Sequence, residues 1–168
     1  MEKSNTTEYK FLQQQGYPEI EQEDPGAQFR PLQFQPAIVS TLMLLAIALQ
    51  SPGIFFAVGA VLWINVFFPG MNIFELFFNR FLADRLNLRK IYPAPNPRRF
   101  AQGMAAMFMS IAGTGIMAGW HTIAYASQTF IVIAFSLLLF GKFCLGAYIY
   151  QLLLGRTRFA NETCPWNA

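Results

Sequence analysis

The chain has 168 residues and a net charge of +3, and 54% of its residues are hydrophobic but only 12% are charged, against about 25% in soluble domains. No charged side chain occurs between Arg30 and Glu75 or from Phe100 to Gly141, which excludes an ordinary water-soluble fold and indicates a lipid bilayer as the solvent. The small, scattered charge excludes a nucleic-acid interface, and two distant cysteines give neither a disulfide framework nor a zinc site.

Residues 1–30 are predicted to form a polar, acidic cytoplasmic tail, because no apolar period runs through them. The first residues are acidic and polar instead of basic and then apolar, so no signal peptide is predicted. The segment is either a solvated tail or an arm that docks on a partner. Its acidic cluster consists of Glu19, Glu21, Glu23 and Asp24.

Residues 31–70 are predicted to form a first membrane hairpin. Pro36 is expected to open its first helix, Ser51-Pro52 to begin the second and Pro69-Gly70 to end it. Arms of roughly 15 to 18 residues would be about 22–27 Å long, slightly short of a 30 Å hydrocarbon core, so the hairpin either spans the bilayer or re-enters it. Asn65, a polar residue at depth, is expected to bond to a neighbouring helix.

Residues 71–98 are predicted to form an amphipathic helix on the membrane surface, followed by a proline-rich connector. Asn72, with Glu75 three residues later, is typical of a helix N-terminus. Glu75 belongs to the polar side of this helix, which should face away from the membrane. The opposite, apolar side consists of Phe74, Phe77, Phe78, Phe81 and Leu82.

Residues 99–155 are predicted to form a second membrane hairpin, and residues 156–168 a short cytoplasmic tail. The third helix would run from about Arg99 to Gly119, and the fourth from about Ala124 past Lys142 towards Gly155. PLQFQPAIVSTLM (31–43) and PRRFAQGMAAMFM (97–109) share Pro, Phe and Met at matching offsets, which favours an internal duplication. The predicted fold is therefore an all-α polytopic membrane protein with four transmembrane helices in two hairpins.

The basic residues indicate the orientation of this fold. Lys and Arg occur in the central segment and near the C-terminus, but the two hairpin tips carry none. By the positive-inside rule, both termini and the central segment are expected to be cytoplasmic. The side chains expected near the lipid phosphates are Arg80, Arg85, Arg89, Lys90, Arg98, Arg99 and Lys142.

Small and weakly polar side chains recur every four residues along the third helix, which allows another helix to approach closely. The partner of this face is either another helix of the same four-helix unit or a helix of a partner subunit. The face consists of Gln102, Ala106, Ser110, Thr114 and Ala118, to which Gly115 and Gly119 add a second small pair.

His121, the only histidine, lies beside Trp120 at the tip of the second hairpin. One histidine excludes a bis-histidine haem within this chain and leaves either a single axial ligand or an interfacial side chain in an aromatic belt. The 18 phenylalanines could stack on a pigment or quinone, although packing against lipid and core explains them without one. We expect no cofactor, no metal and no catalytic residue, because no nucleotide loop, zinc motif or Ser/His/Asp set occurs.

Cys144 lies in FGKFCLGAYIY (140–150), close to Lys142. Lys142 is expected to extend to the cytoplasmic phosphates, which puts Cys144 at that interface. A neighbouring ammonium favours a reactive thiolate, whereas a buried cysteine is usually a small packing residue. Cys144 is therefore either a candidate thiol or a packing residue.

FQPA (34–37), PRRFAQG (97–103) and FCLG (143–146) with Tyr150 resemble the bacterial integral-membrane family DUF4395, over roughly residues 29 to 152. The resemblance implies a bacterial inner membrane, and it implies that relatives often carry a second cysteine three residues after the first. Some relatives lie beside thioredoxin-like or sulfurtransferase genes, which implies dithiol or sulfur chemistry. Ala147 occupies the second position here, so a dithiol within this motif is excluded. Cys164 would have to fold back to supply the other sulfur.

The expected function is that of a non-catalytic accessory or scaffolding subunit of a membrane complex, with the lipid bilayer and other membrane subunits as its partners. One alternative is a membrane protein that handles thiols or sulfur through Cys144. Others are a pigment- or quinone-associated subunit and a carrier of a small neutral solute, since the uncharged tracts argue against ions and protons.

Overall fold

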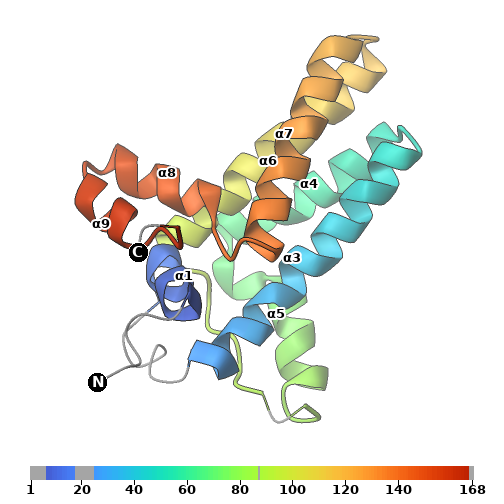
Figure 1. Ribbon diagram of the computed structural model, residues 1–168. Helices are drawn as coiled ribbons and strands as arrows, with labels where there is room; N and C mark the ends of the chain where they lie inside the picture. The colour runs from blue at the N-terminus through green and yellow to red at the C-terminus, as the bar shows by residue number, and fades with distance from the viewer. Residues whose placement is uncertain (1–6, 18–24, 87, 167–168) are drawn as a thin grey trace.

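The computed structural model describes residues 7–17, 25–86 and 88–166, and the regular elements in these ranges are all helical (Figure 1). Three helices are long and apolar enough to cross a membrane, at Phe29–Ala48, Asn96–Met117 and His121–Leu139. A shorter apolar helix covers Pro52–Phe67. The predicted all-helical class is therefore confirmed, and three of its helices are candidate membrane spans.

The first hairpin consists of α3 (Pro25–Ala48) and α4 (Pro52–Phe67). Ser51 is the N-cap of α4 and Pro52 follows it, as expected, although the Ser51 hydroxyl makes no capping hydrogen bond. The expectation that the first helix opens at Pro36 is wrong, because α3 begins at Pro25 and continues through Pro31 and Pro36. Each proline removes one helical N–H donor, and the helix is held across both positions by the burial of Leu32 and by the hydrogen bonds that Gln35 accepts.

The second hairpin consists of α6 (Asn96–Met117) and α7 (His121–Leu139). Gly119 has φ +72° in the turn between them, a conformation that glycine adopts without steric cost. Helix α6 packs on both α4 and α7 and so joins the two hairpins. The core between the four helices consists of Val39, Met43, Ala46, Phe55, Val58, Leu62, Ala106, Met109, Ala112, Ile131 and Phe135.

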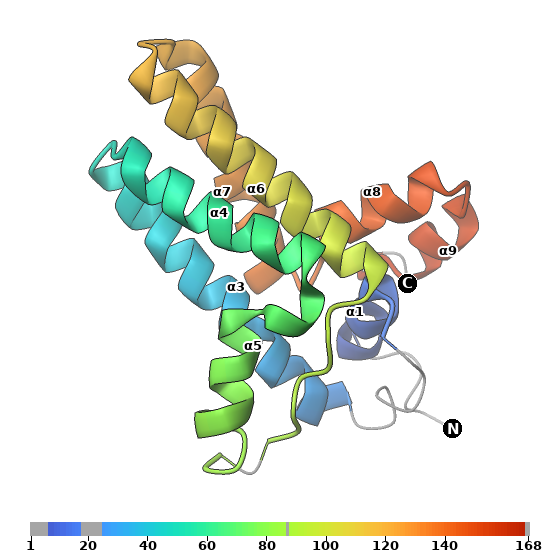
Figure 2. The same cartoon turned by 180° about the vertical axis from the view of Figure 1, so that it is seen from behind.

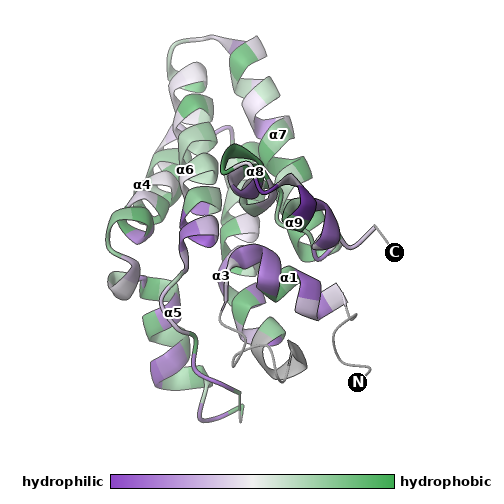
Figure 3. Ribbon diagram, turned by 90° about the vertical axis from the view of Figure 1, so that its left-hand side faces the viewer, coloured by the Kyte–Doolittle hydropathy of each residue, from purple (hydrophilic) through white to green (hydrophobic). Residues whose placement is uncertain are grey.

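Both hairpin turns point to the same side of the molecule, and helices α1 (Thr7–Gln15), α5 (Ile73–Phe77), α8 (Leu145–Leu153) and α9 (Thr157–Glu162) gather at the other (Figures 1 and 2). We call these two sides the turn end and the base. Hydrophobic residues dominate the four long helices, whereas α1 and α9 are largely hydrophilic (Figure 3). Many apolar side chains on the long helices are exposed, as a helix surrounded by lipid requires. They include Leu44, Ile64, Phe67, Met107, Met117, Ile123 and Ile133.

The expectation of one continuous fourth helix from Ala124 to Gly155 is wrong. Helix α7 ends at Leu139, and a separate helix, α8 (Leu145–Leu153), follows and leads into α9 (Thr157–Glu162). Lys142 has φ +48° in the intervening turn, which redirects the chain. A Cβ atom on Gly146 would lie 2.6 Å from Ala101 Cα, so α8 begins in direct contact with the α6 backbone. This tertiary contact favours two helices over one.

The segment after α4 differs from the predicted surface helix. A short 3-10 helix, η2 (Pro69–Met71), precedes α5 (Ile73–Phe77), and a π-helical turn, η3 (Phe78–Leu82), follows it. The Asn72 side chain accepts a hydrogen bond from the Phe74 amide at 3.2 Å, as its predicted capping role requires. Glu75, expected on the outer polar side, is instead buried, because it faces a buried arginine of α6.

The N-terminal segment also differs from the predicted solvated tail. Residues Thr7–Gln15 form helix α1, which packs against α3, α6 and α8. Phe11 and Leu12 are buried, so a segment with little apolar content still contributes to the core. The acidic cluster of Glu19, Glu21, Glu23 and Asp24 lies outside the described residues.

Candidate functional site

A buried polar network lies at the base and is centred on the side-chain oxygen of Gln35 on α3. Gln35 Oε1 accepts hydrogen bonds from Asn72 Nδ2 at 3.0 Å, Gln102 Nε2 at 3.1 Å and Arg98 Nη2 at 3.4 Å. Asn72 caps α5, and Arg98 and Gln102 lie one helical turn apart on α6. One amide oxygen therefore links α3, α5 and α6.

Arg98 is 5% exposed, which corrects the prediction that it lies at the membrane surface. Its Nη1 atom donates to the Tyr17 hydroxyl at 2.7 Å, and its Nη2 atom lies 3.6 Å from Glu75 Oε1. That second distance is longer than a hydrogen bond, so Arg98 and Glu75 attract each other by charge alone. Burial raises the pKa of Glu75 above its ordinary value, although Arg98 and the Asn72 side chain act to lower it.

The other predicted surface cations are divided between protein contacts and solvent. Arg99 Nε donates to the Val66 carbonyl at 2.9 Å, and Lys142 Nζ lies 2.9 Å from Glu8 Oε1. Lys90 lies 4.0 Å from Asp84 in an exposed pair. Arg80, Arg85 and Arg89 are exposed.

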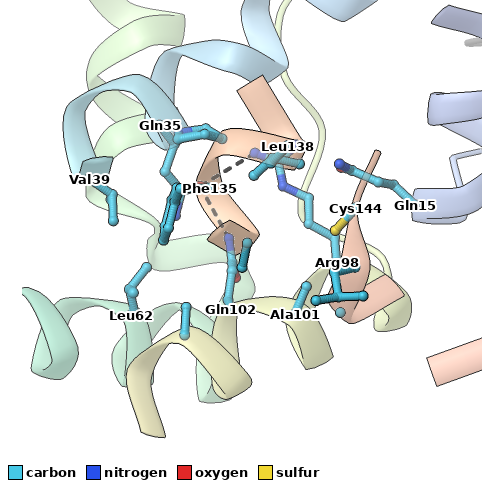
Figure 4. A pocket seen from close by; sticks show the side chains of 15 residues that line it. Gln15, Gln35, Val39, Leu62, Arg98, Ala101, Gln102, Phe135, Leu138 and Cys144 are labelled. Atoms are coloured by element: carbon cyan, nitrogen blue, oxygen red, sulfur yellow. Dashed lines mark hydrogen bonds between the residues drawn. The ribbon is translucent and has the colours of Figure 1, made fainter. Parts of the chain in front are cut away.

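A cavity of about 90 Å³ adjoins this network between α3, α6, α7 and the start of α8 (Figure 4). Its apolar wall includes Val39, Leu62, Phe135 and Leu138. Its polar wall consists of Gln15, Gln35, Arg98, Gln102 and Cys144. Gln15 extends from α1 towards Cys144 (Figure 4). The arrangement is that of a small binding site, apolar on one side and polar on the other.

Cys144 is the N-cap residue of α8 and is 5% exposed. Its backbone N–H donates to Gln14 Oε1 at 2.9 Å. Burial raises the pKa of the Cys144 thiol, whereas the Ala147 and Gly146 amides and the Arg98 charge act to lower it. Cys144 and Cys164 are both free cysteines.

The predicted packing face of α6 is divided between the interior and the surface. Gln102, Ala106 and Gly115 are buried within the chain, Ser110 is half-buried, and Thr114, Ala118 and Gly119 are exposed. Ser110 and Thr114 line an open groove of about 370 Å³ near the turn end. Its other walls include Trp63 of α4 and Trp120 of the second turn.

His121 is exposed at the start of α7, with its ring centroid 6.3 Å from that of Tyr125. No cluster of three or more His, Cys, Asp or Glu side chains that would suit a metal occurs within the described ranges. Asn65 is buried, and neither of its side-chain polar atoms has a hydrogen-bond partner among the described residues. The expected bond from Asn65 to a neighbouring helix is therefore absent there.

A model of the family described as a domain of unknown function (DUF4395) matches residues 29–154. The chain belongs to the DUF4395 family. No curated protein and no solved structure matches it. The DUF4395 region contains Gln35, Arg98, Gln102 and Cys144, whereas α1, which supplies Gln15 to the same cavity, precedes the matched region.

The sequence prediction missed most of the polar network in this DUF4395 protein. Two signals were available: Gln35 is a polar residue inside an uncharged tract, and three consecutive glutamines occupy positions 13–15. A buried glutamine requires hydrogen-bond partners, so a glutamine at membrane depth indicates a polar centre. Tyr17 gave no comparable signal because it lies in polar sequence, and Glu75 gave none because its place in the predicted capping pattern already accounted for it.

Proposed function

We propose that this DUF4395 chain is a multi-pass protein of a bacterial inner membrane, with α3, α4, α6 and α7 spanning the bilayer and both termini in the cytoplasm. The supporting observation is the charge distribution. The hairpin turns near Ser51 and Gly119 carry no Lys or Arg, whereas the segment from Arg80 to Arg99 is basic and the C-terminal part of the chain carries Lys142, Arg156 and Arg158. Helix α4 is about 24 Å long at 1.5 Å per residue, so it would span with a slight local thinning of the bilayer.

A protease added to intact spheroplasts tests this topology. Trypsin should leave the basic segment between Arg80 and Arg99 uncut until the membrane is permeabilised. Cleavage there from outside would invert the proposed orientation. A chain that stays in solution after high-speed centrifugation without detergent would contradict the membrane location itself.

Within the membrane, we propose that the protein is a non-catalytic accessory or scaffolding subunit that binds a transmembrane helix of another subunit along α6. The supporting observation is the groove lined by Ser110 and Thr114, beyond which the small, exposed Ala118 continues the same face of α6. Small residues spaced by four allow helices to pack closely, and Ser or Thr can add an interhelical hydrogen bond. Trp63 and Trp120 form walls that a partner helix would contact.

Purification in mild detergent should recover a second membrane protein in fixed stoichiometry with this chain. Thr114→Leu and Ala118→Leu fill the face and should reduce that recovery at least about tenfold. Ile133→Leu, on an exposed part of α7, is the matched control and should leave recovery unchanged. A monodisperse monomer, or equal recovery with all three variants, would refute the accessory role.

A second candidate function is thiol or sulfur handling by Cys144. It is favoured by one observation, namely that Cys144 lines the cavity at a helix N-terminus, where the Gly146 and Ala147 amides and Arg98 act to favour the thiolate. Burial outweighs these effects in the closed structure, so reactivity would require α1 to move away. In a Cys164→Ser background, deletion of residues 1–17 should increase maleimide labelling of Cys144. Unchanged growth of a Cys144→Ala strain on all sulfur sources would exclude this function.

A further inference from the structure

Two adjoining cavities lie where α6, α7 and α8 meet. The first is the 90 Å³ cavity with Gln15, Gln102 and Cys144 in its wall. The second, of about 40 Å³, is lined only by apolar residues, among them Met104, Phe108, Phe130 and Ile131. Six residues contribute to both walls: Ala101, Ala105, Ala134, Phe135, Leu145 and Gly146. The first cavity, which has one polar and one apolar wall and which we call the polar chamber, therefore lies directly beside an entirely apolar one.

The polar chamber contains hydrogen-bond acceptors that the protein does not satisfy. Gln102 is 8% exposed and Gln15 is 4% exposed, and the Oε1 atom of each has no hydrogen-bond partner among the described residues. Gln102 Nε2 already donates to Gln35, which fixes the orientation of its amide. Buried acceptors without donors are uncommon in folded proteins, so the chamber suits a molecule that brings O–H or N–H donors.

The charges around the chamber indicate that this molecule is neutral. Arg98 is the only cation in the cavity wall, and Glu75 lies 3.6 Å from it. Gln35 and Tyr17 accept further hydrogen bonds from Arg98. A charged ligand would lose its hydration without gaining an unpaired opposite charge, which is costly in a buried site.

The size of the chamber restricts the head group. An engineered cavity of about 150 Å³ holds a benzene ring, so a chamber of about 90 Å³ is too small for a substituted aromatic ring. This argues against a quinone or pigment head in the structure described. A hydroxyl-bearing head of a few atoms fits the chamber. Phe108 and Phe130, with ring centroids 4.2 Å apart, border the apolar chamber where a hydrocarbon tail would begin.

We propose that the two cavities form one binding site for an uncharged lipid with a small hydroxyl head, of the long-chain alcohol type. The head hydroxyl donates to Gln102 or Gln15, and the tail passes between α6 and α7 into the bilayer. Binding forms no covalent bond and requires no cofactor. The site depends on the proposed membrane location but not on the proposed partner subunit, because the groove beside Thr114 is at the other end of α6.

Photo-crosslinking of the full-length protein in nanodiscs tests the proposal. The probe is a decanol that carries a diazirine in its chain, and crosslinked residues are mapped by mass spectrometry. Labelling should be saturable and should concentrate on residues 101–108 and 130–146. Unlabelled 1-decanol should compete, whereas decyl methyl ether, which lacks the donor, and decylammonium, which is charged, should compete at least about tenfold less well. Butanol should fail as well, which distinguishes a membrane lipid from a free small alcohol.

Two variants make the result specific. Gln102→Leu removes the acceptor and Ala134→Leu fills the shared wall, so each should reduce saturable labelling about tenfold or more. Gln128→Leu replaces a buried glutamine near the turn end and is the matched control, which should retain labelling. Circular dichroism and gel filtration identify any variant that fails to fold. If Gln102→Leu fails to fold, the decisive comparison is the labelling of Ala134→Leu, which removes no polar group, with that of the unchanged protein.

Three results would overturn the proposal: equal competition by the ether, labelling spread over the lipid-facing sides of α3 and α4, or unchanged labelling of folded Ala134→Leu. A chamber filled by water alone would give the first or second result. If no partner subunit is recovered in the co-purification experiment, labelling by the decanol probe should still be observed. The proposal of a lipid site and the proposal of a partner subunit can therefore be refuted independently.

Discussion

The helices pack against one another mainly through apolar side chains at the turn end, and also through buried polar side chains at the base. Near the turns, the helices meet through apolar side chains such as Met43, Phe55 and Met109. The polar contact between the hairpins near the turns is the Gln50–Gln128 amide pair, at 3.3 Å in each direction. At the base, an arginine and amides of the same helices are buried together with a glutamate of α5.

This difference indicates which end of the molecule depends on specific pairs of side chains. Apolar packing in a membrane tolerates exchange of one apolar side chain for another of similar volume. A buried network does not, because each donor or acceptor that loses its partner remains buried and unsatisfied. The base is therefore expected to be the sensitive end and the turn end the tolerant one. Four substitutions or titrations test this comparison.

The largest effect is expected for Arg98→Met. It leaves the Glu75 carboxylate buried without its opposite charge, which costs about 3–5 kcal/mol of unfolding free energy. Unfolding by sodium dodecyl sulfate, followed by circular dichroism, measures that loss. Arg85→Met, at an exposed position, should change stability by less than about 0.5 kcal/mol. Equal stability of the two variants would show that the Arg98–Glu75 pair does not stabilise the fold. If the pair does, the double variant Arg98→Met with Glu75→Leu should recover most of the lost unfolding free energy.

A direct comparison of the two ends is provided by Gln35→Leu and Gln128→Leu. Gln35→Leu removes the acceptor for donors of Asn72, Arg98 and Gln102, so it should cost at least about 2 kcal/mol. Gln128→Leu removes a partner only from Gln50, which is exposed and can bond to water instead, so it should cost less than about 1 kcal/mol. The same unfolding measurement applies. Similar losses at both ends would refute the distinction.

Gly146→Ala tests whether α8 is held against α6 by direct backbone contact. The added Cβ would lie 2.6 Å from Ala101 Cα, so the two helices must separate, at a cost of about 1–3 kcal/mol. The shift should also widen the cavity mouth and speed maleimide labelling of Cys144. Gly70→Ala is the control, because its Cβ would meet nothing within 4 Å. Unfolding temperatures that match for the two variants would show that α8 is loosely attached.

The smallest effect is expected from the ionisation of Glu75. Its raised pKa means that, just above the ordinary value of 4.5, the folded chain retains a proton that the unfolded chain has lost. In that window the folded state binds more protons, so this group makes the unfolding free energy fall as the pH rises. Glu75→Gln does not titrate and should remove that part of the pH dependence. Denaturation curves recorded between about pH 4.5 and 7 measure it, and parallel profiles for both proteins would contradict the assignment.

The sequence predicted features that neighbouring residues determine. Both turns, the end of α4 and the Asn72 cap follow from local glycine, proline and capping residues, and the structure contains them. The break after Leu139 was missed because the apolar pattern continues through it. Gly141, whose added Cβ would lie 2.7 Å from the Leu137 carbonyl oxygen, and the positive φ of Lys142 end the helix locally, and the contact of Gly146 with Ala101 holds the next helix in place. The network was missed because the partners of Gln35 lie 37, 63 and 67 residues away.

The position of α1 has a consequence for comparing members of the family. Phe11 packs beside Cys144, and Gln14 binds the Cys144 amide, yet both residues precede the matched region. Two DUF4395 proteins with the same sequence across that region can therefore differ in how exposed the cysteine at this position is. The difference would depend on the segment that precedes the matched region. An assay of one relative's thiol chemistry should thus be transferred to another only after their leader helices have been aligned.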